Sequence, residues 1–151
     1  MKRFIPILLL SFALDSAGSE QNDPEQLMRD VQRSHIEANV PSKAQFDVLA
    51  HRDLLAYFKQ HDSADVSSVE YELLRDGPTQ SGVAYPKFYL WVHVIGGKKN
   101  QSGAVVVAAV AKERLEVYNF MSSAQIRKEP EEVAVTFPAA LVPLITSRAA
   151  K

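Results

Sequence analysis

The stretch from Tyr85 to Met121 constrains the fold of this chain more than any other part of the sequence. It contains three runs rich in Val, Ile, Phe, Tyr and Trp, the residues that fit best on the pleated surface of a β-sheet. A segment rich in glycine and lysine, residues 96–103, separates the first two runs, and the residues 111–114 separate the second from the third. Segments of this composition suit chain reversals. We therefore predict an antiparallel meander of three strands, on which the rest of the chain packs.

The register of this meander decides which side chains share a face. We pair Ile95 with Gly103 across the first turn and Val110 with Leu115 across the second. Opposed side chains point to the same face, and a slip of one residue would exchange the two faces. The opposed pairs are then His93–Val105, Trp91–Val107, Tyr89–Ala109 and Ala108–Val117. The predicted aliphatic face carries Leu90, Val92, Val94, Ala104, Val106, Ala108, Val110, Leu115 and Val117. The predicted mixed face carries Tyr89, Trp91, His93, Val105, Val107, Ala109, Glu116, Tyr118 and Phe120.

The amino terminus has the pattern of a secretory signal peptide. Two basic residues, Lys2 and Arg3, precede an apolar segment, residues 4–14, and the small residues 16–18 follow it. We expect residues 1–18 to be removed, with cleavage after Gly18 or, as an alternative, after Ala17. An uncleaved anchor is the competing interpretation. The chain contains no cysteine, so a lipid-modified leader is excluded. We expect a periplasmic or secreted protein with no stable membrane span after processing.

Length and charge narrow the class of protein further. The 151 residues suit one domain after the leader, and we predict a single domain over residues 19–151. The 17 basic and 18 acidic residues give no broad positive field, so we predict no binding of nucleic acid. Small secreted eukaryotic domains often depend on disulfides. A chain without cysteine therefore favours the bacterial periplasm.

The order of the predicted elements indicates an α+β fold. Two capping residues mark the starts of two amphipathic helices. They are Asp23, which precedes a proline, and Ser42. Residues 66–75 alternate between apolar and polar and predict the first of four strands. The residues after Met121 predict short helical turns and a terminal helix that Pro143 kinks or delays. The result is two N-terminal helices, a four-stranded antiparallel meander and a C-terminal helix.

This element order resembles the cystatin-like and NTF2-like arrangement. In those folds, helices lie across a curved antiparallel sheet, and the space between them can hold a ligand. The resemblance rests on element order, with no sequence motif beside it. It implies that a face of the sheet is available to a ligand.

The mixed face supplies the candidate binding residues. They are Tyr89, Trp91, His93, Glu116 and Tyr118. Aromatic rings can hold an apolar ligand, and an imidazole near a carboxylate can carry protons. The simpler interpretation is ordinary cross-strand packing around a hydrogen-bonded histidine. The four histidines lack metal-ligand spacing, so we predict no metal site and no cofactor.

Three functional hypotheses follow from these residues. The first is a non-enzymatic module that binds a protein partner or a small apolar ligand through the mixed face, with a homodimer as an alternative occupant. The second is a small periplasmic enzyme that uses His93 with Glu116 or another nearby carboxylate. The third is an inhibitor or immunity-type protein that acts through the 96–103 hairpin.

Overall fold

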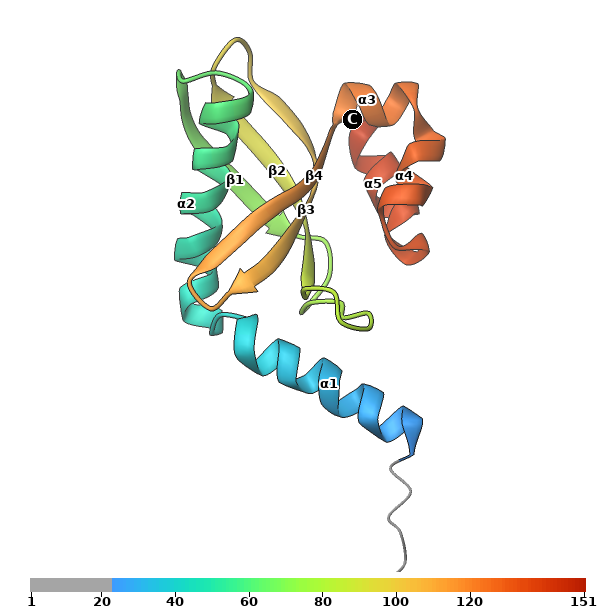
Figure 1. The fold of residues 1–151 in the computed structure, drawn as a ribbon. Coiled ribbons are helices and arrows are strands. Elements are labelled where there is room, and N and C mark those ends of the chain that lie inside the picture. The colour runs from blue at the N-terminus through green and yellow to red at the C-terminus, as the bar shows by residue number, and fades with distance from the viewer. Residues whose placement is uncertain (1–22) are drawn as a thin grey trace, which may run out of the picture.

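A computed structural model describes residues 23–151, so the predicted leader, residues 1–18, lies outside the described part of the chain. The elements follow the predicted order (Figure 1). They are the helices α1 (Pro24–Asn39) and α2 (Lys43–His61), the strands β1 (Val66–Leu73), β2 (Lys87–Gly96), β3 (Gln101–Ala111) and β4 (Arg114–Ser122), the helices α3 (Ser123–Lys128) and α4 (Pro130–Thr136), the 3-10 turn η1 (Ala139–Leu141) and the helix α5 (Val142–Ala149).

The four strands form one antiparallel sheet in the order β1-β2-β3-β4, which is a meander. Helix α2 lies across one face of this sheet, and helices α3 to α5 gather on the other (Figure 1). The predicted α+β fold is therefore confirmed. None of the helices within residues 23–151 is both long and apolar enough to cross a membrane.

The two N-terminal helices begin where the capping residues predict. The Asp23 carboxylate accepts a hydrogen bond from the backbone N–H of Glu25 at 3.1 Å, and the Ser42 hydroxyl accepts one from Gln45 at 3.3 Å. Each cap satisfies a backbone donor that the first helical turn leaves without a partner. Helix α1 buries none of its residues and extends away from the sheet (Figure 1).

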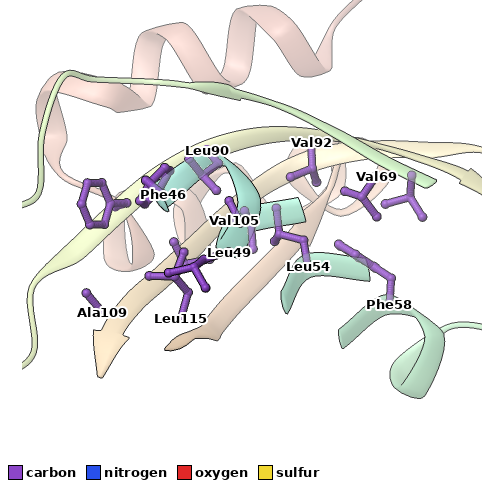
Figure 2. Packing of buried hydrophobic residues seen from close by; sticks show 14 of the residues in the cluster. Phe46, Leu49, Leu54, Phe58, Val69, Leu90, Val92, Val105, Ala109 and Leu115 are labelled. Atoms are coloured by element: carbon purple, nitrogen blue, oxygen red, sulfur yellow. The ribbon is translucent and has the colours of Figure 1, made fainter. Parts of the chain in front are cut away.

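A first hydrophobic core fills the space between α2 and the sheet (Figure 2). Phe58 of α2 meets Phe120 of β4 edge to face, with ring centroids 4.9 Å apart. Burying a large apolar side chain contributes about 1.5–3 kcal/mol. The apolar face of α2 therefore supplies most of the free energy that holds this helix against the sheet. The core includes Phe46, Leu49, Leu54, Phe58, Val69, Leu90, Val92, Val105, Val107, Ala109 and Leu115.

The register between β2 and β3 differs from the predicted one. Leu90 lies opposite Val105, and Trp91 lies opposite Ala104. We predicted Val107 as the partner of Trp91, so the observed register is shifted by three residues. A shift by an odd number of residues turns every side chain of β3 to the opposite face from the predicted one. The cause is the length of β3, which begins at Gln101 because two polar residues assigned to the turn belong to the strand. Val105 and Val107 therefore face α2, and Ala104 and Val106 face the C-terminal helices.

The pairing of β3 with β4 contains two further corrections. Leu115 lies opposite Ala109 rather than Val110. The register then shifts between Val117 and Asn119, so that Tyr118 is an extra residue at a bulge. After this bulge the alternation is reversed, and Phe120 points into the first core instead of the mixed face.

A second hydrophobic core lies under the C-terminal helices. Tyr89 and Trp91 of β2 are only 6% and 4% exposed there, against residues such as Ile126 of α3 and Ile145 of α5. Both faces of the sheet are therefore covered. The predicted mixed face is a buried surface over most of its length rather than an open aromatic one.

Candidate functional site

The five candidate binding residues do not form one surface. Tyr89 and Trp91 are buried in the second core, whereas Tyr118 is 65% exposed, with the Lys87 ammonium 4.7 Å from its ring centre. Glu116 is exposed and pairs with Arg114 at 3.0 Å. His93 is exposed near the end of β2, between the buried residues Val92 and Val94, which point to the other face of the sheet.

His93 and Glu116 are not neighbours. His93 lies opposite Ser102, and Glu116 lies opposite Ala108, six positions further along β3. At about 3.3 Å per residue, these positions are roughly 20 Å apart along the strand. The hypothesis of direct proton transfer between these two side chains is therefore wrong. Even in the predicted register, Glu116 would lie opposite Ala109, four positions along β3 from the predicted partner of His93.

His93 instead borders an open groove of about 960 Å³ at one end of the sheet. Glu70 of β1, the end of β2 and Ser102 of β3 form its floor, residues 99–101 of the hairpin form one wall, and α3 and α5 form the other. The end of α5 and the start of α3 lie at the same end of the sheet as the turn between β2 and β3 (Figure 1). We call this feature the hairpin groove. Of the five candidates, Trp91 and His93 line it.

A serine and a histidine are in contact on the groove floor. His93 Nδ1 lies 2.7 Å from Ser102 Oγ, and either atom can be the donor. Glu70 of β1 lies opposite His93 in the sheet and also lines the groove. A carboxylate, an imidazole and a hydroxyl thus occupy adjacent strands, in a row across the sheet.

Arg148 of α5 is fixed in the helix wall. Its two terminal nitrogens donate to the two carboxylate oxygens of Glu72 at 2.6 and 2.7 Å, a bidentate pair that combines charge with geometric fit. This hydrogen bonding lowers the pKa of Glu72 and raises that of Arg148. The guanidinium also lies 6.0 Å from the centre of the Trp91 ring. Glu72 and Trp91 are cross-strand neighbours, so Arg148 holds α5 against the sheet.

Arg127 of α3 makes the second link within this wall. Its guanidinium donates to the backbone carbonyl of Ala149 at the end of α5. The Ser123 hydroxyl donates to the backbone carbonyl of Ser102 at 3.0 Å and joins α3 to β3. The helix wall is therefore tied both to itself and to the floor.

Most of these residues carry no signal that could be recognised in the sequence. Arg127, Arg148 and Ser102 belong to segments that the chain brings together only through the fold, and no motif connects them. Within residues 23–151, no group of three histidine, aspartate or glutamate side chains is arranged to hold a metal ion.

Comparison with protein-family models, curated proteins and solved structures gave no match for this chain. The resemblance to the cystatin-like and NTF2-like arrangement thus remains one of element order. Any function has to be inferred from the site itself.

Proposed function

We propose that this chain is an exported, non-enzymatic binding protein that takes a small ligand, or a segment of a protein partner, into the hairpin groove. The observation that carries this proposal is the groove itself. It is open to solvent, its walls come from separate segments, and hydrogen bonds hold the helix wall together and against the sheet. Binding sites are typically concave and largely formed before the ligand arrives.

The groove also changes the expected character of the ligand. We expected an apolar ligand on an aromatic face, but Tyr89 and most of Trp91 are covered by the C-terminal helices. The groove offers polar side chains, among them His93 and Ser102, and Trp91 also lines it. We therefore propose a polar ligand that contacts one aromatic edge. Export remains part of the proposal because it rests on the leader pattern of residues 1–18.

A fragment screen by NMR tests the binding function. The ¹⁵N-labelled protein, without the leader, is titrated with a fragment library that contains anionic, neutral and cationic members. We expect saturable shifts of backbone amides around the groove. Ala124 lines the groove and Ala134 of α4 is exposed elsewhere, so Ala124→Phe should abolish these shifts and Ala134→Phe should retain them. Shifts that survive in Ala124→Phe, or no saturable shifts from any fragment, would refute the proposal.

The contact between His93 and Ser102 favours one second candidate, a hydrolytic enzyme. Ser102 Oγ would attack an ester carbonyl while His93 Nδ1 accepts the hydroxyl proton and passes it to the departing alcohol as the ester C–O bond breaks. Water would then hydrolyse the acyl-serine ester, which releases the carboxylic acid and restores Ser102. A fluorophosphonate probe tests this directly, because it adds a defined mass to an activated serine. Labelling that Ser102→Ala abolishes would support the enzyme. An unlabelled protein would leave the contact as a hydrogen bond between two surface residues.

A further inference from the structure

We infer that the ligand of the hairpin groove is an anion, held through a carboxylate or phosphate group. This inference rests on the proposed binding function and adds the chemical class of the ligand. Three features of the groove support it: the sign of its charge, the fixed position of its guanidinium groups and its supply of hydroxyl donors.

The charged side chains that line the groove are mostly positive. Four are Lys or Arg, namely Lys99, Arg127, Arg148 and Lys151, and one is acidic, Glu70. Glu72, which does not line the groove, neutralises Arg148. The three remaining cations are then opposed by a single carboxylate, that of Glu70. The whole chain has a net charge of −1, so the positive charge of the groove is a local concentration. A concave surface lined by one sign of charge focuses its field on ligands of the opposite sign.

The positive groups come from both walls. Lys99 belongs to the hairpin wall, and Arg127 belongs to the helix wall. A ligand between the walls would meet a cation on each side. This arrangement suits an anionic group, because each cation would interact with oxygens on a different side of it.

The arginines are already ordered before a ligand binds. Arg127 is held by the Ala149 carbonyl, which uses one of its five N–H donors. Arg148 is held by Glu72 beside Trp91. Binding to fixed side chains avoids part of the entropy cost of ordering them, so the remaining donors of Arg127 are suited to oxygen acceptors.

Hydroxyl groups add neutral donors to the same space. Ser102 lies on the floor, and Ser147 lies on the helix wall. When His93 donates its Nδ1 proton to Ser102 Oγ, the hydroxyl hydrogen of Ser102 is free for another acceptor. The site then offers cationic and neutral donors together.

Citrate and pyrophosphate serve as probes, since they distinguish a carboxylate ligand from a phosphate ligand. Binding is measured by calorimetry and by the fluorescence of Trp91, the only tryptophan of the chain, at constant ionic strength. We expect at least one anion to bind and to change the fluorescence. Arg127→Gln should weaken binding by about tenfold, the effect of losing one charge-assisted hydrogen bond. Arg127→Lys, which keeps the charge, should recover part of the affinity.

Arg114→Gln is the matched control, because Arg114 is an exposed arginine at the opposite end of the sheet from the groove. It should leave the affinity unchanged. Equal binding by wild type and Arg127→Gln, or equal weakening by Arg127→Gln and Arg114→Gln, would overturn the inference. If neutral or cationic fragments bind the groove and neither anion does, the inference fails while the binding function stands. If no fragment of any charge binds there, both fail.

Discussion

The arrangement of two cores on one sheet predicts that adjacent residues of β3 contribute equally to stability. Val106 is 4% exposed and points toward the C-terminal helices, whereas Val107 is 1% exposed and points toward α2. Truncation of either to alanine should therefore destabilise the protein to a similar extent. A sheet with one open face would behave differently, because one of the two valines would lose little.

The expected magnitude follows from the two methyl groups that each substitution removes. Their transfer from water is worth about 0.8 kcal/mol per group, or roughly 1.6 kcal/mol in total. The cavity left in a packed core adds to this loss, and we expect about 2–3 kcal/mol for each variant. Val135 of α4 is the control, since it is 82% exposed and its truncation should change stability by less than about 0.5 kcal/mol.

Urea unfolding, followed by circular dichroism and by Trp91 fluorescence, measures the three free energies. Coincident transitions by the two probes would justify a two-state analysis. The structure requires similar losses for Val106→Ala and Val107→Ala and almost none for Val135→Ala. If the loss for one of these two variants is less than half that for the other, one face of the sheet is not covered as described.

Three other predictions concern the close approach of β3 and β4 at Gly103, the ion pair between Glu72 and Arg148, and the predicted leader. Gly103→Ala should lower the urea midpoint by the equivalent of roughly 1–3 kcal/mol, because an added Cβ would lie 2.2 Å from the backbone oxygen of Met121; a midpoint equal to wild type would contradict this contact. Arg148 lowers the pKa of Glu72, so the pair stabilises the fold above the ordinary glutamate pKa, and this contribution is lost as the pH falls through the lowered value. The stability difference between wild type and Glu72→Gln should therefore shrink from neutral to acidic pH, and a difference that does not change with pH would be evidence against the pair. The intact mass of protein from a bacterial periplasm should match a chain that begins near Ser19, whereas a full-length chain in the cytoplasm would exclude export.

The elements were predictable because their signals are local. Asp23 with its following proline, and Ser42 before α2, supply caps within three residues of the groups that they satisfy. The four strands carry enough β-branched and aromatic residues to be recognised without tertiary contacts. The helices after β4 were also anticipated, including a terminal helix whose start Pro143 delays until Val142.

The register was not predictable by the same means. Val105, Val106 and Val107 are all apolar, so neither face of β3 differs enough in polarity to fix the alternation. A strand buried on both faces lacks the pattern of alternating apolar and polar residues that sets the register in a half-exposed sheet. The bulge at Tyr118 has no separate sequence signal either, and it alone moves Phe120 from one core to the other.

The position of the hairpin groove can nevertheless be related to the sequence once β3 is known to begin at Gln101. Toward the middle of the sheet, Trp91 lies opposite Ala104, and both are covered by the C-terminal helices. Two residues nearer the hairpin, the pair becomes His93 and Ser102, which are polar and have no apolar cover to bury them. The apolar contact of the C-terminal helices with the sheet therefore ends where the residues of this face change from apolar to polar. The groove lies at that change, and the same change places a histidine, a serine and the neighbouring cations where a soluble ligand can reach them.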